Sequence, residues 1–158
     1  MPIETERKFL VKDHRFKELA VKSFRIKQGY IAHDGGNTVR VRIRDKEGFL
    51  TIKGPSLDGI SRQEWEKSIP LQDAEELMGL CHGGIIDKTR YIVPAAGELC
   101  FEVDEFHGAN QGLVMAEIEL PSAGTPFNRP VWLGEEVTGD KRYYNSYLTK
   151  VPYKDWPA

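Results

Sequence analysis

Several features that mark common protein classes are scarce or absent in this sequence. Its two cysteines, Cys81 and Cys100, stand far apart without a Cys-x-x-Cys spacing, which argues against a disulfide framework or a cysteine-rich zinc site. The 22 Lys and Arg are balanced by 24 Asp and Glu, so the formal net charge of −2 lacks the basic excess typical of nucleic-acid binding. Apolar runs are only a few residues long, and the first residues do not resemble a signal peptide. We therefore expect a cytoplasmic protein with no membrane or nucleic-acid partner.

Standard phosphate-binding and metal-binding motifs are also missing. The sequence contains neither a P-loop nor a dinucleotide fingerprint, so a bound phosphate would have to be held by side chains. The four histidines, His14, His33, His82 and His107, lack the paired spacing of metal ligands.

What the sequence does contain is a two-residue alternation of polar and apolar residues. Of its 158 residues, 40% are hydrophobic and 29% charged, enough for one domain, spanning residues 1–158, with a core of its own. The alternation predicts strands at residues 2–11, 24–34, 37–45, 48–54, 61–70, 84–93, 98–107 and 112–121. Short helices are predicted at 13–20 and 72–80, and one or two more at 131–137 and 143–148. We expect a mainly β protein whose consecutive strands pair as an antiparallel meander and close into a barrel.

Arginines alternate with apolar residues in the third predicted strand. Arg40, Arg42 and Arg44 share one face, roughly 6.5–7 Å apart, with valine and isoleucine between them. Neighbouring like charges repel, and a solvated face would mix signs. A bridging polyanion, such as a chain of phosphates, accounts for such a row through charge-assisted bonds.

The same ionic pattern recurs on the other predicted strands. The same-face sets contain eight cations (Lys8, Arg40, Arg42, Arg44, Lys53, Arg62, Lys88 and Arg90) and eight acids (Glu4, Glu6, Glu64, Glu66, Glu102, Asp104, Glu117 and Glu119). The opposite faces of several strands are apolar and need a cover, which the short helices and the C-terminal segment can provide. With the charged face inward, an eight-stranded barrel becomes a binding tunnel for one small ligand.

The carboxylates favour a hard divalent cation. Glu4 and Glu6 share a face of the first predicted strand, and Glu117 and Glu119 share a face of the last. Oxygen ligands without histidine or cysteine point to Mg²⁺ or Mn²⁺ over zinc. A tunnel with both charge types suits a metal-bound polyphosphate.

With these motifs the sequence resembles the CYTH superfamily, also called triphosphate tunnel metalloenzymes. The family signature Glu-x-Glu-x-Lys matches residues 4–8. Further matches are Gln28-Gly29-Tyr30, Arg40-Val41-Arg42-Ile43-Arg44, Lys53-Gly54, Glu64-Trp65-Glu66, Lys88-Thr89-Arg90, Glu102-Val103-Asp104, Glu117-Ile118-Glu119 and residues 138–145. The resemblance spans nearly the whole chain and implies an eight-stranded antiparallel tunnel with short covering helices.

The resemblance also implies roles for individual residues. Metal ligands would be Glu4, Glu6, Glu117 and Glu119, with Glu64 and Asp104 as further ligands or supporting groups. Phosphate contacts would be Lys8, Arg40, Arg42, Arg44, Lys53, Lys88 and Arg90. Glu4, Glu6 or Glu64 would orient the attacking water. Tyr30 resembles the family's proposed proton acceptor, although a hydroxyl hydrogen bond explains it equally well.

The C-terminal region offers two interpretations. Lys141 or Arg142 resembles the basic residue of a helix that plugs the family's tunnel, and a surface charge is the alternative. Residues 143–145 are expected to pack that helix on the barrel wall. Trp65 and Trp132 are expected to contact the covering helices from outside.

Among the activities the resemblance implies, metal-dependent hydrolysis of inorganic tripolyphosphate fits a compact chain best. A class IV-type adenylate cyclase, which makes cyclic AMP from ATP, is the first alternative, although no base-binding signature is evident. A non-catalytic module that binds polyphosphate or nucleotide is the second, although binding an anion alone does not call for so many carboxylates. A homodimer is left open by the sequence.

Overall fold

The computed structural model describes residues 3–56, 58 and 61–157, and for residues 3 and 4 the backbone alone. The strands of this part of the chain are β1 (Ile3–Val11), β2 (Lys22–Asp34), β3 (Asn37–Arg44), β4 (Glu47–Lys53), β5 (Ser61–Ile69), β6 (His82–Pro94), β7 (Cys100–Phe106), β8 (Val114–Leu120) and β9 (Leu133–Glu136). The helices are α1 (Phe16–Leu19), α2 (Leu71–Met78) and α3 (Asn145–Leu148), with 3-10 turns η1 (Gly108–Asn110), η2 (Lys141–Tyr143) and η3 (Tyr153–Asp155). Within the same residues no helix is long and apolar enough to cross a membrane.

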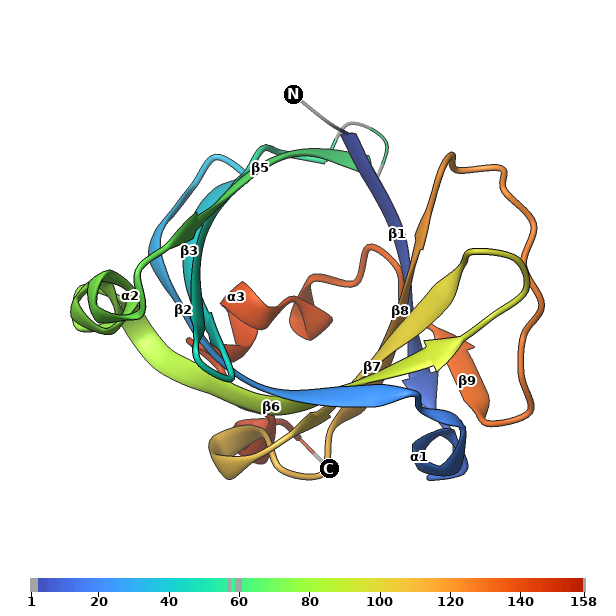
Figure 1. Ribbon diagram of the computed structural model, residues 1–158. Coiled ribbons are helices and arrows are strands. Elements are labelled where there is room, and N and C mark those ends of the chain that lie inside the picture. Colours follow the sequence, from blue (N-terminus) through green and yellow to red (C-terminus); the bar gives the residue numbers. More distant parts are fainter. Residues whose placement is uncertain (1–2, 57, 59–60, 158) are drawn as a thin grey trace.

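Strands β1 to β8 form a closed antiparallel barrel, as Figure 1 shows in a view through it. The strand order is β5-β4-β3-β2-β6-β7-β8-β1, and pairing of β5 with β1 closes the ring. The predicted fold class is therefore confirmed. The expected meander is wrong at two places, because β2 pairs with β6 and β1 pairs with β8 and β5. At both places a helical connection, α1 or α2, separates the consecutive strands, so they need not be neighbours.

The short strand β9 lies beside β1, where the sequence predicted a helix at 131–137. Among the described residues, the second edge of β1 pairs with β5 through residues 3–5, and its other end pairs with β9 through Phe9 and Val11. An unpaired strand edge offers hydrogen-bonding groups that β9 satisfies. The strands approach closely at Gly134, where a Cβ would come within 2.9 Å of the Leu10 carbonyl oxygen. A tertiary contact thus decides the conformation of this segment.

The main hydrophobic core lies outside the barrel wall. Phe9, Phe101 and Ile118 project outward and are buried together with Phe16 of α1 and Trp132, as predicted for this tryptophan. On another part of the wall α2 packs against β3 and β4. Gly48 permits this approach, since a Cβ there would lie 2.7 Å from the Cβ of Ala74. Trp65, by contrast, is 39% exposed and does not serve as the expected covering contact.

A second apolar cluster closes one end of the barrel interior. Ile86, Phe106 and Met115 lie two residues before or after charged inward-facing positions of the same strands, and they pack with Leu148 of α3. Tyr143, Tyr153 and Trp156 cover this cluster. Figure 1 shows α3 and the neighbouring turns inside the outline of the barrel. The interior therefore has an apolar floor formed by the C-terminal segment, and charged walls above it.

Candidate functional site

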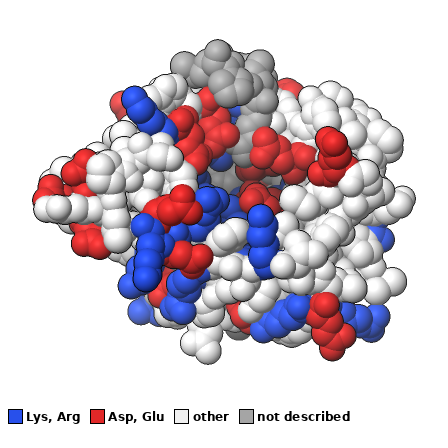
Figure 2. Space-filling model, in the orientation of Figure 1, with Lys and Arg blue, Asp and Glu red and all other residues white. Residues whose placement is uncertain are grey.

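The barrel encloses a cavity of about 520 Å³ whose walls are mostly charged. Figure 2 shows acidic and basic side chains gathered around a central hollow. Most of the sequence-predicted site residues line this cavity, namely Glu6, Lys8, Tyr30, Arg40, Arg42, Arg44, Lys53, Glu64, Lys88, Arg90, Glu117 and Glu119. They come from seven different strands, each of which turns alternate side chains inward. The structure thus brings together residues that are far apart in sequence.

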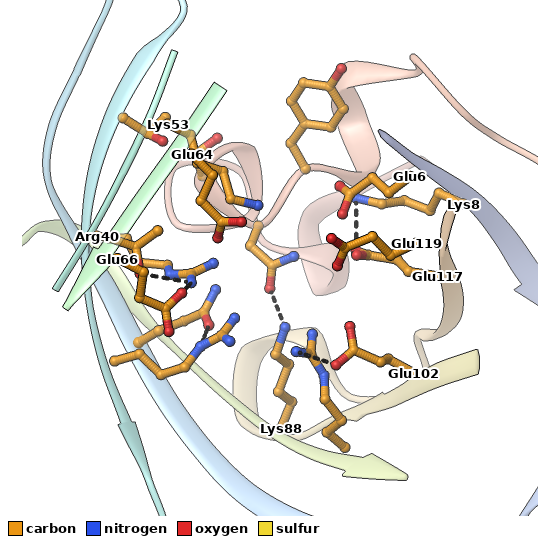
Figure 3. A pocket seen from close by; sticks show the side chains of 18 of the residues that line it. Glu6, Lys8, Arg40, Lys53, Glu64, Glu66, Lys88, Glu102, Glu117 and Glu119 are labelled. Carbon is orange, nitrogen blue, oxygen red and sulfur yellow. Dashed lines mark hydrogen bonds and ion pairs between the residues drawn. The ribbon is translucent and has the colours of Figure 1, made fainter. Parts of the chain in front are cut away.

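Carboxylates crowd one wall of the cavity. Glu6 on β1 lies directly across from Glu119 on β8, and Glu117 lies across from Glu102 on β7. Figure 3 shows Glu6, Glu117 and Glu119 on one side, facing Lys53, Arg40, Glu64 and Glu66 on the other. Like charges in directly opposed positions destabilise a sheet unless a cation lies between them. This wall is the place where a cation would offset the repulsion.

The carboxylate oxygens of this wall are suitable ligands for a hard divalent ion, but they do not form a complete ligand set. Among the described residues, no three His, Cys, Asp or Glu side chains already converge as a ligand group. Mg²⁺, however, is usually bound by one or two carboxylates, with water and substrate phosphates completing its shell. Glu4 was also predicted as a ligand; its side chain lies outside the described residues, and its backbone pairs with that of Arg62. The donor set therefore fits an ion that binds together with a phosphate.

The arginines of β3 form a row that lacks enough acceptors within the described protein. Arg42 Nε donates to Gln28 Oε1 at 2.8 Å, and Arg40 donates through a terminal nitrogen to Thr51 Oγ1 at 3.1 Å. The Nε atoms of Arg40 and Arg44 are buried and have no hydrogen-bond partner in this part of the chain. Burial, with help from Arg40 and Arg90, lowers the pKa of Arg42 to about 9. Buried cationic donors without acceptors favour an anionic ligand.

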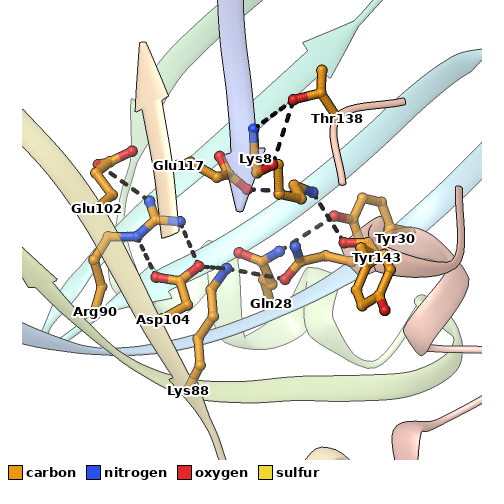
Figure 4. A network of polar contacts seen from close by, with 11 residues as sticks. Lys8, Gln28, Tyr30, Lys88, Arg90, Glu102, Asp104, Glu117, Thr138 and Tyr143 are labelled. Atoms are coloured by element: carbon orange, nitrogen blue, oxygen red, sulfur yellow. Dashed lines mark hydrogen bonds and ion pairs between the residues drawn. The ribbon is translucent and has the colours of Figure 1, made fainter. Parts of the chain in front are cut away.

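Asp104, predicted as a further metal ligand or a supporting group, is buried among basic side chains. It does not line the cavity but lies behind it, 2% exposed, with one oxygen 2.8 Å from Arg90 Nε and the other 2.7 Å from Lys88 Nζ (Figure 4). Burial alone would raise the pKa of Asp104, but Arg90 and Lys88 outweigh it and hold the pKa well below its usual range. Both oxygens are thus engaged by cations. Asp104 orients the two basic residues that face the cavity.

Lys88 is completely buried, and its pKa is low for a lysine. Burial lowers its pKa to about 7, and Arg90 and Arg42 act in the same direction against the attraction of Asp104. Its ammonium group also donates to Asn145 Oδ1 at 3.0 Å. An anion in the cavity would favour the charged form of this lysine.

The predicted plug cations lie away from the cavity. Arg142 forms two hydrogen bonds with the side chain of Asp140 and is 58% exposed, and Lys141 is exposed as well. Neither lines the cavity. The 3-10 turn η2 directs these side chains outward and brings the following residues inward.

Some cavity residues were not predicted as site residues from the sequence. They are Lys22, Phe24, Gln28, Thr38, Thr51, Ile92, Cys100, Thr138, Tyr144, Asn145 and Ser146. Gln28 shares a strand face with Tyr30, so the alternation contained its signal. Tyr144 and Asn145 were expected to pack the helix on the wall, and instead they face the cavity.

A closed antiparallel barrel with cationic rows and opposed carboxylates inside defines a class of protein that holds a polyanion together with a metal ion. The CYTH domain model matches residues 2–152, and the chain belongs to this family. Family membership implies dependence on a divalent metal.

Individual relatives cover nearly the whole chain. An inorganic triphosphatase of Acetivibrio thermocellus is 49% identical over 97% of each chain. An inorganic triphosphatase of Nitrosomonas europaea is 38% identical, over 92% of this chain and 95% of the relative. A crystal structure of the inorganic triphosphatase NE1496 superposes with a TM-score of 0.67 at 35% identity, covering 94% of this chain and 95% of that one.

Proposed function

We propose that this protein hydrolyses inorganic tripolyphosphate with the help of Mg²⁺ or Mn²⁺. The observation that carries the proposal is one cavity in which buried guanidinium nitrogens have no acceptor among the described residues, while carboxylates lie opposite one another on paired strands. A metal-bound polyphosphate accounts for both features, because its oxygens accept hydrogen bonds from the guanidinium groups and its cation offsets the repulsion between the carboxylates. Two relatives named inorganic triphosphatase, 49% and 38% identical, support the choice of substrate.

The phosphates would be held by the basic residues of the cavity. These are Lys8, Arg40, Arg42, Arg44, Lys53, Lys88 and Arg90. Their distribution around the barrel allows contacts to several phosphate groups, and the guanidinium forks suit bidentate binding. The Arg90 and Lys88 side chains are held in place by Asp104, which we propose as a positioning residue in place of its predicted role as a metal ligand.

The metal ion would be held by Glu6, Glu117 and Glu119, with Glu4 as a further candidate. A divalent ion bound there supplies charge neutralisation for the phosphate oxygens and polarises the phosphorus centre. Mg²⁺ and Mn²⁺ share the preference for carboxylate oxygens.

Hydrolysis joins a water oxygen to the terminal phosphorus and breaks the bond between that phosphorus and the bridging oxygen. Glu64 would orient this water and accept its proton, because it lines the wall opposite Glu6 and lies across from Lys53 in the sheet. Tyr30 would donate its hydroxyl proton to a phosphate oxygen. Its oxygen lies 3.3 Å from the Gln28 amide nitrogen, which leaves the hydroxyl hydrogen available.

Phosphate release from tripolyphosphate, ATP and thiamine triphosphate tests this function directly. Each substrate is assayed with Mg²⁺, with Mn²⁺ and with a chelator, and the ATP sample is also assayed for cyclic AMP. We expect metal-dependent release that is fastest on tripolyphosphate and lost in Glu6→Gln while the circular dichroism spectrum is unchanged. Cyclic AMP without phosphate release would instead indicate the cyclase, and binding without any turnover the non-catalytic module.

We further propose that residues 1–158 act as one domain in the cytoplasm. Cys81 and Cys100 are both free thiols, which agrees with a reducing compartment.

A further inference from the structure

Two buried lysines of the cavity have matching surroundings. Lys8 Nζ lies 3.4 Å from a Glu117 oxygen and donates at 3.0 Å to the backbone carbonyl of Tyr143. Lys88 Nζ lies 2.7 Å from an Asp104 oxygen and donates at 3.0 Å to Asn145 Oδ1. In each case one acceptor is a carboxylate of the barrel wall and the other is a neutral oxygen of the C-terminal segment (Figure 4).

An aromatic ring completes each arrangement. The Tyr144 ring centroid lies 5.2 Å from Lys8 Nζ, and the Phe106 ring centroid lies 5.4 Å from Lys88 Nζ. An ammonium group has three N–H donors. When two of them are directed to fixed acceptors, the direction of the third is fixed as well. Both lysines line the cavity, so these two acceptors set how each ammonium group is turned relative to a ligand held there.

The C-terminal segment is itself held firmly enough to act as a support. Leu148 is buried in the apolar floor with Ile86 and Met115. The Thr149 hydroxyl donates to the Ser146 carbonyl at 2.6 Å, and the Leu148 N–H donates to the Tyr144 carbonyl at 3.1 Å. The Tyr143 carbonyl and the Asn145 amide therefore occupy defined positions relative to the barrel.

On the basis of the proposed function, we infer that residues 143–145 are part of the triphosphate site. The Tyr143 carbonyl and the Asn145 side chain orient the Lys8 and Lys88 ammonium groups toward the phosphates, and Asn145 is a positioning residue for substrate binding. This role differs from that of a plug with its own basic residue, since Lys141 and Arg142 lie outside the cavity.

Two substitutions of Asn145 distinguish the loss of its hydrogen-bond acceptor from a change in side-chain size. Asn145→Leu keeps the size of the side chain and removes the acceptor, whereas Asn145→Gln keeps an amide acceptor and adds no charge. The readouts are the dissociation constant of tripolyphosphate without metal, by titration calorimetry, and KM and kcat with Mg²⁺. For Asn145→Leu we expect Kd and KM to rise together by about tenfold, as for the loss of one hydrogen bond to a charged group, with a smaller change in kcat. Asn145→Gln should remain within about threefold of the unaltered protein.

Asn110→Ala is the matched control, because it loosens the C-terminal segment outside the cavity without touching either lysine. It should lower the melting temperature and leave Kd unchanged. If Asn145→Leu does not fold, Asn145→Ala takes its place with the same expected rise in Kd. Unaltered binding in the acceptor-free variant, equal damage in Asn145→Gln, or an equal loss of affinity in Asn110→Ala would each overturn the inference. Because Kd is measured without turnover, a wild-type protein that binds but does not hydrolyse would contradict only the proposed function.

Discussion

Arg42 connects the arginine row to the neighbouring strand through its bond with Gln28. We predict that Arg42→Ala weakens metal-free binding of tripolyphosphate by about 1.5–3 kcal/mol, the value of a hydrogen bond to a charged group. Titration calorimetry gives the dissociation constant. Arg25→Ala is the matched control, because Arg25 pairs with Asp87 at an exposed position away from the cavity. Equal affinities in all three proteins would remove Arg42 from the site.

Asp104 pairs with two buried cations, so replacing it by the neutral asparagine should destabilise the folded protein. In Asp104→Asn the Arg90 charge stays buried without this carboxylate, and the pKa of Lys88 falls further, so we expect the free energy of unfolding to fall by about 3–5 kcal/mol. Urea denaturation followed by circular dichroism measures this change. Glu102→Gln, which loses only a half-exposed contact to Arg90 at 3.4 Å, should cost less than about 1 kcal/mol. A loss in Asp104→Asn as small as in this control would contradict the assignment.

For single residues, the sequence predicted on which face of a strand a side chain lies but not how deeply it is buried. Alternation placed Asp104 and Glu102 on the same inward face, and both do point inward. The depth depends on partners from a neighbouring strand: Glu102 lines the cavity, whereas Asp104 is buried against Lys88 and Arg90 of β6. Asn145 could not be found in this way, because it follows the 3-10 turn η2 in a segment without periodicity.

Among the elements, β9 is held against β1 by the side chain of Glu136 as well as by backbone pairing. Glu136 accepts hydrogen bonds from Arg7, Arg129 and Thr138, which together anchor β9 and the start of the C-terminal segment to β1. The Arg7 hydrogen bonds, helped by those of Thr138 and Arg129, lower the pKa of Glu136 to about 2 against the opposing effect of burial.

This shift predicts how stability depends on pH. The folded pKa of Glu136 lies below the unfolded one, so its contribution is present above about pH 4.5 and is lost as the pH falls toward 2. We expect about 1 kcal/mol for this partly exposed cluster. Urea denaturation at pH 6 and pH 3 should show a smaller pH-dependent loss in Glu136→Gln than in the wild type. Glu135→Gln, on the exposed neighbouring position, serves as the control. Parallel losses in all three proteins would show that Glu136 does not contribute this pH dependence.

The ends of the eight barrel strands could be predicted to within a few residues, because their alternation is continuous. Their pairing could not, since the bonds of β2 to β6 and of β1 to β8 join distant segments and leave no local pattern. The four residues of β9 are too few for a period to be recognised, and Gly134 and nearby prolines disfavour any regular structure. Residues 133–136 form a strand because they pair with the edge of β1.

For the whole molecule, a cavity with buried cations should make stability depend on its ligand. A ligand that binds the folded state alone stabilises it by about 2.7 kcal/mol at a concentration one hundred times its dissociation constant. In a protein of this size that corresponds to a rise in Tm of roughly 5–10 °C. Scanning calorimetry with tripolyphosphate in the presence of a chelator measures the shift. Sulfate at the same ionic strength is the control, and an equal shift with both salts would indicate a general salt effect.

The position of the hydrophobic core outside the barrel wall has a consequence for protein engineering. Phe9, Phe101, Ile118 and Val41 stabilise the shell from positions that alternate with those lining the cavity. Replacing a side chain that lines the cavity therefore leaves no void among these outward-facing packed residues. The lining of this barrel could be redesigned for anions of another length or charge by changing every second residue of β3 and β5, while the scaffold that surrounds it keeps its own sequence.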